Sequence, residues 1–144
     1  MKRAIITGAT GFVGANLARR LLREGHEVHL LVRPGCRRWR IESIERDVRR
    51  IDVDLHDAQE VAGAITSVRP DWIFHLAAYG AYSFQKDREE MVRTNVQGTL
   101  HLLEACLKSG FEAFVNTGSS SEYGFKAHAP AESSAMAVSS VPLE

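Results

Sequence analysis

The stretch that decides the fold is MKRAIITGATGFVG, Met1–Gly14. An apolar run leads into three glycines spaced three residues apart, Gly8, Gly11 and Gly14, and an amphipathic segment follows at once. This order predicts a strand, a tight turn and a helix start, whose backbone N–H groups can bind a pyrophosphate. Gly8 would permit the turn, Gly11 would let phosphates approach the backbone, and Gly14 would let the helix lie close to the sheet. An ordinary glycine-rich turn is the alternative, and the flanking strand and helix argue against it.

The bulk composition bounds the class of protein. The chain has 144 residues, the size of one domain, and its 18 basic and 18 acidic residues cancel. The chain therefore has no net positive charge that would attract nucleic acid or an anionic membrane. The two cysteines, Cys36 and Cys106, form no disulfide or metal-ligand pattern, which fits a reducing compartment. No apolar run is long enough to span a membrane, so a cytoplasmic location is expected, with neither nucleic acid nor membrane as a partner.

Apolar runs and helical periodicity alternate along the chain. The expected strands are residues 3–7, 27–32, 48–53, 72–76 and 113–117, and the expected helices are 12–24, 39–45, 58–68 and 87–109. This order predicts an α/β fold, a doubly wound parallel sheet of five strands with a Rossmann-like NAD(P)-binding architecture. Residues 1–124 would form this domain, and residues 125–144, which lack periodicity, an irregular tail.

Two helices have specific expected features. In helix 12–24 the larger apolar residues, Phe12, Leu17, Leu21 and Leu22, would form the buried stripe. In helix 58–68, Asp57 would be the N-cap, because Glu60 stands three residues later as in a capping box.

The end of the second strand is where the cofactor would be selected. Position 33 lies about 20 residues past the glycine motif, where an acidic residue would hold a ribose 2′-OH. The residue there is Arg33, with Arg37 and Arg38 close by. A guanidinium attracts a 2′-phosphate and can bind it in bidentate fashion, so NADP is favoured over NAD. A solvated basic loop is the alternative interpretation.

Two further strand ends carry candidate binding residues, because ligands of such sheets bind beyond the carboxyl ends of the strands. Asp54 could accept a hydrogen bond from an adenine amino group, with Leu55 packed against the ring. A turn aspartate is an equal alternative. Ala77 and Ala78 are small where the backbone would approach a cofactor, or where a helix packs tightly on a strand.

Several polar residues have more than one interpretation. Asn95 occupies the interior of helix 87–109, where asparagine is unfavourable, so its side chain serves either a structural bond or a ligand. His75 and His101 are interpreted as structural histidines, and Cys106 as a core residue. Ser119, at the end of the fifth strand, could hydrogen-bond a substrate hydroxyl or carbonyl, or belong to a polar turn.

Taken in order, the motifs resemble the N-terminal part of the extended short-chain dehydrogenase/reductase family, nucleotide-sugar epimerase/dehydratase type. The resemblance covers Met1 to about Gly124. The matching segments are Thr7–Gly14, Asp54-Leu55, His75-Leu76-Ala77-Ala78, Asn95–Thr99 and Ser119–Gly124.

The resemblance implies a role for each matching residue. In the family, the active-site Ser/Thr works with a Tyr-x-x-x-Lys pair, in which the tyrosine exchanges a proton with a sugar hydroxyl while hydride passes to or from nicotinamide. Ser119 would be that active-site residue. The complete protein would take a nucleotide-sugar substrate and form a homodimer through helix 87–109. The residues that would bind NADP or NAD are Gly8, Thr10, Gly11, Phe12, Val13, Gly14, Arg33, Asp54, Leu55, Leu76, Ala77, Ala78, Asn95 and Thr117.

Two departures from the family pattern qualify the expected activity. No Tyr-x-x-x-Lys follows the fifth strand; Tyr82 and Lys86 have that spacing but precede it, which we interpret as coincidence. The chain is therefore expected to be a truncated part that binds cofactor at best and does not turn over. The sugar dehydratases also carry an acid two places after the active-site Ser/Thr, where this chain has Ser121, so an epimerase or keto-sugar reductase is favoured.

Two other functions stay open. One is a non-catalytic NADP-sensing regulator related to the atypical short-chain dehydrogenases, which share the glycine-rich start and an arginine after the second strand. The motifs Asn95–Thr99 and Ser119–Gly124 argue against it. The other is a remnant that binds no cofactor.

Overall fold

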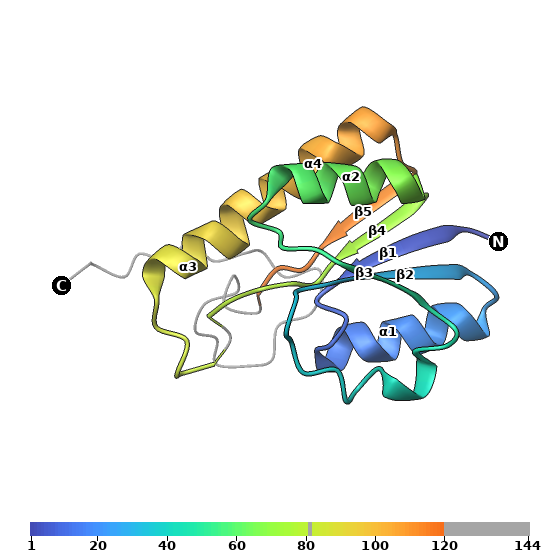
Figure 1. Cartoon of the computed structure of the whole chain (residues 1–144), viewed down its shortest axis with the longest axis horizontal. Coiled ribbons are helices and arrows are strands. Elements are labelled where there is room, and N and C mark those ends of the chain that lie inside the picture. Colours follow the sequence, from blue (N-terminus) through green and yellow to red (C-terminus); the bar gives the residue numbers. More distant parts are fainter. Residues whose placement is uncertain (81, 120–144) are drawn as a thin grey trace, which may run out of the picture.

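Strands and helices alternate through the described part of the chain, residues 1–80 and 82–119 of a computed structural model (Figure 1). A 3₁₀ turn (η1) and a π-helical turn (η2) accompany the α-helices. The elements are β1 (Arg3–Thr7), α1 (Phe12–Arg23), β2 (Glu27–Val32), η1 (Glu42–Ile44), β3 (Arg49–Asp52), α2 (Ala58–Val68), β4 (Trp72–His75), α3 (Arg88–Val92), η2 (Arg93–Gln97), α4 (Gly98–Ser109) and β5 (Ala113–Asn116).

The five strands form one parallel sheet in the order β3-β2-β1-β4-β5. The chain first winds outward from β1 to β3, then crosses back to lay β4 on the other side of β1. Figure 1 shows α1 on one face of the sheet and α2 and α4 on the other. The predicted doubly wound Rossmann-like architecture is therefore confirmed, and the direction of winding changes between β1 and β4, where such folds bind ligands.

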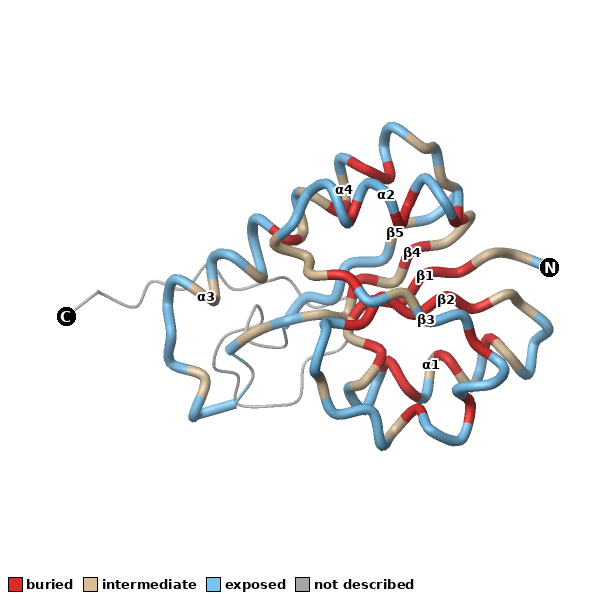
Figure 2. Tube along the Cα trace, viewed as in Figure 1, coloured by how far each residue is buried: buried red, intermediate tan, exposed pale blue. Residues whose placement is uncertain are grey.

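The core has two layers, one on each face of the sheet, and the central strands contribute to both. Along β1, Ala4 and Ile6 pack toward α1, and Ile5 packs toward α2 and α4. Figure 2 shows the same arrangement, with buried segments along the central strands and on one side of each long helix. This two-sided burial explains why the strands are continuous apolar runs rather than alternating ones.

Helix α1 confirms most of the predicted apolar stripe and corrects its first position: Leu21 is buried, and Leu17 and Leu22 pack partly buried against the core. Its buried residues are Gly14, Ala15, Ala18 and Leu21, whereas Phe12 at its first position is 74% exposed. Small side chains form part of the contact face because α1 packs very close to the glycine turn and the sheet.

The other predicted elements need only small corrections. The predicted helix 39–45 is only the 3₁₀ turn η1, and helix 87–109 is interrupted by η2. Asp57 caps α2 as predicted, accepting from the backbone N–H of Gln59 and Glu60. Glu60, however, accepts from the backbone N–H of Asp54 at 2.9 Å. The predicted domain boundary at residue 124 and the tail 125–144 lie outside the described residues.

Candidate functional site

The turn after β1 is built from glycines that cannot carry side chains. Gly8 has φ +66°, and a Cβ on it would lie 2.6 Å from the backbone carbonyl of Leu76. A Cβ on Gly14 would lie 2.5 Å from the Gly8 oxygen. Gly11 donates its N–H to that same oxygen at 3.0 Å. The first glycine thus fits β1 against the end of β4, and the third fits α1 against the turn.

The N-terminus of α1 opens toward this turn. Gly11 is its N-cap residue, and no side chain of the described ranges caps the helix or places an acidic group in its first turn. The first N–H groups of a helix lack partners within the helix and carry a partial positive charge. Phe12 and Val13, both exposed, flank these groups. This is the arrangement in which a helix start binds an anion such as a phosphate.

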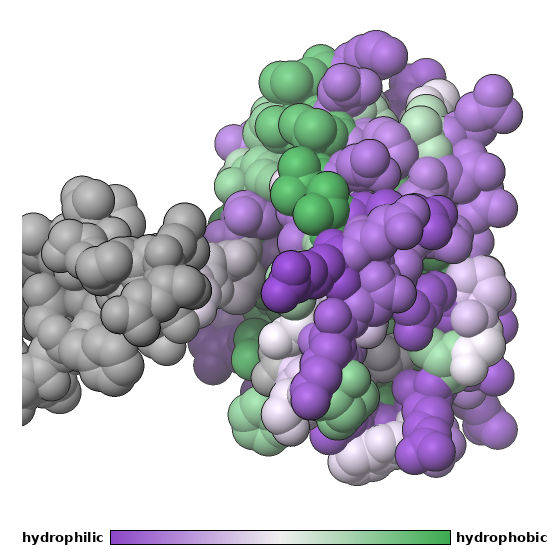
Figure 3. All heavy atoms as spheres, turned by 90° about the vertical axis from the view of Figure 1, so that its left-hand side faces the viewer, coloured by the Kyte–Doolittle hydropathy of each residue, from purple (hydrophilic) through white to green (hydrophobic). Residues whose placement is uncertain are grey.

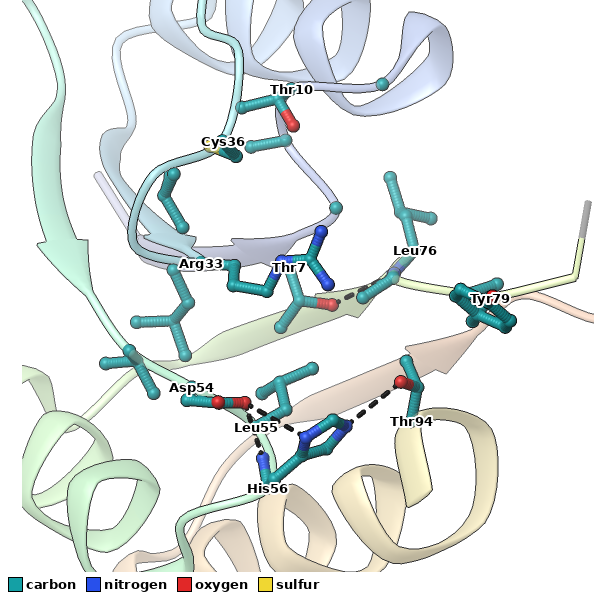
Figure 4. A pocket seen from close by; sticks show the side chains of 18 of the residues that line it. Thr7, Thr10, Arg33, Cys36, Asp54, Leu55, His56, Leu76, Tyr79 and Thr94 are labelled. Atoms are coloured by element: carbon teal, nitrogen blue, oxygen red, sulfur yellow. Dashed lines mark hydrogen bonds and ion pairs between the residues drawn. The ribbon is translucent and has the colours of Figure 1, made fainter. Parts of the chain in front are cut away.

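A pocket of about 350 Å³ lies beside the turn, beyond the carboxyl ends of β1 to β4 (Figure 4). Most of the residues predicted from the strand ends line it: Gly8, Thr10, Gly11, Arg33, Asp54, Leu55, Leu76, Ala77 and Ala78. The other predicted residues are not among its lining: Phe12, Val13, Gly14, Asn95, Thr117 and Ser119.

A chain of hydrogen bonds holds the β1 and β4 ends together. The Thr7 hydroxyl accepts the N–H groups of Leu76 and Ala77, both at 3.2 Å. Its own proton is then free for His75 Nδ1, 2.6 Å away. His75 must therefore carry its proton on Nε2, which donates to the Thr99 hydroxyl at 2.8 Å. The sequence interpretation of His75 as structural is confirmed.

Burial keeps this histidine neutral. The His75 side chain is 2% exposed, and burial lowers its pKa to about 4. A second proton on Nδ1 would also face the Thr7 hydroxyl, which already accepts two N–H groups. His75 is thus a fixed neutral link between the sheet and α4.

Asn95 fastens the loop after β4 rather than lining the pocket. Its side-chain oxygen accepts the Tyr79 N–H at 2.8 Å, and its amide donates to the Tyr79 carbonyl at 2.7 Å. It does so from the π-helical turn η2, and π turns are frequent at functional sites. Gly98, directly after this turn, lets α4 pack against Leu55, since a Cβ there would lie 3.1 Å from the Leu55 Cβ. The unfavourable Asn and Gly in this helix therefore both serve tertiary contacts.

Asp54 combines its two predicted roles. Its Oδ1 accepts the His56 N–H at 3.0 Å, which is a local turn bond. The side chain is nevertheless 45% exposed and lines the pocket, so it can also accept from a ligand. His56 lies beside it and contacts the Thr94 hydroxyl through Nε2 at 3.0 Å (Figure 4).

Of the three arginines near the end of β2, only Arg33 lines the pocket. Its side chain is 66% exposed and extends over the pocket in Figure 4, with Nη1 3.9 Å from Glu90 Oε1. Arg38 pairs instead with Glu45 at 3.6 Å. A fourth arginine was not anticipated: Arg40 donates to the carbonyl of Thr10 in the glycine turn, with Nη1 at 3.4 Å.

Sequence reasoning missed the lining residues that come from loops and helix faces. His56 and Thr94 stand next to motif residues, but nothing in their spacing indicated a site. Tyr79, Tyr82 and Gln85 belong to the loop after β4, whose small and aromatic residues were the only signal; the remaining lining residues are Thr7, Ala9, Leu31, Val32, Cys36 and Val53. Lys86, which has the Tyr-x-x-x-Lys spacing from Tyr82, is not among the lining residues, in agreement with coincidence.

A model of one protein family, the NAD dependent epimerase/dehydratase family, matches residues 4–142. The chain belongs to this family. The resemblance inferred from the glycine turn and the strand ends is thereby confirmed.

Proteins with different described activities are similar to this chain. A Synechocystis protein described as a dihydroflavonol 4-reductase is 41% identical over 125 residues, which are 84% of this chain and 34% of that protein. A GDP-mannose 4,6-dehydratase of Yersinia enterocolitica is 33% identical over 144 residues, covering 90% of this chain and 38% of the dehydratase. The chain thus spans about a third of the length of these relatives.

Solved structures of nucleotide-sugar enzymes share the fold. The Bordetella bronchiseptica enzyme WbmG, solved in complex with NAD and UDP, superposes with a TM-score of 0.78 at 30% identity. The match covers 94% of this chain and 44% of WbmG. The sheet and its flanking helices are therefore those of a known NAD-binding enzyme.

The segment expected to belong to the family's reaction centre begins at Ser119. Ser119 is the last described residue and is exposed; the rest of its motif, residues 120–124, lies outside the described residues. Among residues 1–80 and 82–119, Cys36 and Cys106 are free thiols, and no cluster of metal-ligating side chains occurs. No helix within these ranges is long and apolar enough to cross a membrane.

Proposed function

We propose that this chain binds NAD(P) in the pocket beyond β1 to β4. The observation that carries the proposal is the glycine turn packed under an uncapped helix start, where a Cβ at Gly8 or Gly14 would overlap backbone. Gly8, Thr10 and Gly11 would hold the pyrophosphate with backbone groups. The pocket's apolar and small residues suit the rest of a dinucleotide. The NAD bound to WbmG supports the same assignment.

The remaining lining residues would divide between the two ends of the cofactor. Asp54 and Leu55, at the β3 end, would receive the adenine. Leu76, Ala77 and Ala78, at the β4 end, would line the nicotinamide side, where the small side chains of Ala77 and Ala78 leave the backbone accessible. The hydrogen bonds that link Thr7, His75 and Thr99 would hold the backbone at the β4 end in place.

The reaction proposed for the complete protein is oxidoreductase-type chemistry on a sugar carbon of a nucleotide-sugar. A bound nicotinamide supplies hydride transfer, and Ser119 would hydrogen-bond the sugar hydroxyl or carbonyl. Because residues 120 and 121 are serines, an epimerase or keto-sugar reductase is favoured over a dehydratase. The UDP in the WbmG structure supports a nucleotide-sugar substrate, and the Synechocystis relative described as a dihydroflavonol 4-reductase supports oxidoreductase chemistry.

The competing proposal is an NADP-sensing regulator, because the atypical short-chain dehydrogenases share the glycine-rich start and an arginine after the second strand, here Arg33. The two functions differ in the complete protein. A reductase would transfer hydride from its reduced nicotinamide to an added keto-sugar nucleotide, so the absorbance of the reduced cofactor would fall. An epimerase would reduce its oxidised nicotinamide only transiently before returning the hydride to the sugar, so that absorbance would rise and fall again. A regulator would bind NADP and leave that absorbance constant.

Arg33 is expected to favour NADP. Replacing it with alanine removes the guanidinium that would pair with the 2′-phosphate, so NADP affinity should fall about tenfold, a loss of about 1.4 kcal/mol. NAD affinity should change less than twofold. Isothermal titration of both cofactors measures the effect, with Arg37→Ala as the control, because Arg37 does not line the pocket. Equal losses for NAD and NADP would rule out a specific 2′-phosphate contact.

A homodimer through the long helix is also proposed. Val92, Val96, Leu100 and Leu107 recur at helical spacing and are 50–64% exposed. Figure 3, which faces the α3 end of the molecule, shows apolar side chains gathered on its upper part. Exposed apolar patches of this kind mark interaction surfaces.

The two free thiols also support a cytoplasmic location for the protein.

The dimer makes a prediction of its own. One chain has a mass of 16.0 kDa, so light scattering at micromolar concentration should give about twice that mass. Leu100→Glu should halve that mass, because a carboxylate in an apolar interface is costly. A Leu100→Glu variant that scatters like the wild-type protein would place the contact elsewhere.

A further inference from the structure

The carboxylate that would accept the ribose hydroxyl of the bound adenosine does not come from the end of β2. This inference rests on the proposed cofactor site. NAD and NADP differ only at the adenosine ribose, which carries a 2′-hydroxyl in one and a 2′-phosphate in the other. In folds of this class a carboxylate after the second strand accepts the 2′-hydroxyl. Here residues 33–38 read Arg-Pro-Gly-Cys-Arg-Arg and contain no carboxylate.

Glu90, on α3, reaches the same place from the opposite side of the pocket. Its Oε1 lies 3.9 Å from Arg33 Nη1, although the two residues are 57 positions apart in sequence. The side chain of Glu90 is 23% exposed, and that of Arg33 is 66% exposed. The ion pair therefore joins a partly buried carboxylate to a more exposed guanidinium, and any group that the guanidinium binds comes close to Glu90.

The position of Glu90 is fixed by its neighbours. The Thr94 hydroxyl, one helical turn later, donates to Glu90 Oε1 at 3.4 Å. His56 Nε2 lies 3.8 Å from the same oxygen, and His56 also contacts Asp54, the residue proposed to receive the adenine. The backbone N–H of Glu90 is bound by the side chain of Asp87. Glu90 is not itself among the lining residues, but its carboxylate contacts His56 and Thr94, which line the pocket at the end that would hold the adenosine.

We propose that Glu90 is a specificity-determining residue for the cofactor, acting against Arg33. Its carboxylate accepts the ribose 2′-hydroxyl of NAD, the task of the missing carboxylate after β2. With NADP it opposes binding in two ways: it repels the 2′-phosphate, and it competes for the guanidinium that this phosphate needs. The preference set by Arg33 is thereby moderated, and the site accepts both cofactors.

Two substitutions separate the two roles of the carboxylate. Glu90→Gln removes the charge but keeps an oxygen acceptor, so NADP should bind about fivefold more tightly and NAD affinity should change less than twofold. Glu90→Ala removes the acceptor as well, so it should give the same gain for NADP together with a loss of about fivefold for NAD. Glu89→Gln is the matched control, because Glu89 lies next to it on α3 and is exposed.

The measurement is isothermal titration of each 144-residue chain with NAD and with NADP, together with its thermal unfolding midpoint to establish that it is folded. A Glu90→Gln variant without tighter NADP binding, or a Glu90→Ala variant without weaker NAD binding, overturns the inference. The same gain for NADP in Glu89→Gln overturns it too, because the effect would then be the general charge of α3. If the wild-type chain binds neither cofactor, the proposed function itself fails; if it binds them and the ratio is insensitive to residue 90, only the role of Glu90 fails.

Discussion

Alanine in place of Gly8 is expected to lower the free energy of unfolding by about 3 kcal/mol or more. The left-handed conformation of this residue, φ +66°, costs an L-residue about 1–2 kcal/mol. In addition, the new Cβ would lie 2.6 Å from the backbone of Leu76 and 2.7 Å from the Ala77 nitrogen, so β1 and β4 would have to separate. Denaturant unfolding followed by circular dichroism measures the loss. Cofactor affinity should fall with it, because the same separation distorts the pocket.

Gly35→Ala is the matched control for this prediction. Gly35 has φ +75°, but no atom lies within 4 Å of the position its Cβ would take. It should therefore show only the conformational cost, about 1–2 kcal/mol. Equal losses in the two variants would mean that the close approach of β1 to the end of β4 does not constrain Gly8.

Acidification is expected to remove about 3 kcal/mol of stability through His75 alone. In the unfolded chain this histidine titrates near its ordinary pKa of 6.5, and in the folded chain burial lowers the pKa to about 4. Between these values the unfolded state binds a proton that the folded state does not, so the stability present above pH 6.5 is lost as the pH falls toward 4. Each pKa unit is worth about 1.4 kcal/mol. Burial also lowers the pKa of His29, which adds in the same direction.

Unfolding free energies measured between pH 7 and pH 4 test this prediction. The His75→Gln variant should be less stable than the wild-type protein at pH 7, because the hydrogen bonds to Thr7 and Thr99 are lost. Its free energy of unfolding should nevertheless fall less than that of the wild-type protein on acidification. Asp71, whose pKa the Arg3 N–H lowers from 3.8, titrates below this window. A His75→Gln variant with the same pH dependence as the wild-type protein would contradict the assignment of His75 as the buried neutral link.

The strands and the glycine turn were predicted well, because each of these sequence patterns follows directly from a physical constraint on the element. The strands of this sheet are buried on both faces, so they appear in the sequence as uninterrupted apolar runs. The turn demands residues without side chains at Gly8 and Gly14, and nothing but glycine meets that demand. The strand-end residues Asp54 and Ala77 could be placed at the pocket because the carboxyl ends of parallel strands meet at one edge of the sheet.

Predictions failed where tertiary packing outweighed hydrophobicity. The buried face of α1 was assigned to larger apolar residues, of which the three leucines do pack on the core, but Ala15 and Ala18 are also buried there, where the helix lies close to the turn. Phe12 is left exposed at the mouth of the site. The π-helical turn in the long helix leaves the apolar spacing nearly unchanged, so only the unfavourable Asn95 hinted at it.

The pocket's remaining walls could not be predicted because they depend on distant segments. Asn95 binds Tyr79 across 16 residues of chain, and Glu90 meets Arg33 across a still longer span. No periodicity or motif records such a contact. The cofactor preference inferred from Arg33 alone is therefore refined by a residue that only the folded chain brings to it.

The claim that the glycine turn and the neighbouring strand ends form a dinucleotide site is tested most directly by calorimetric titration of the chain with NADP and NAD. The account predicts one site per chain, tighter binding of NADP than of NAD, and loss of both in Gly11→Val, whose side chain would occupy the phosphate approach. The absence of heat with either cofactor, or unchanged affinity in Gly11→Val, would contradict it.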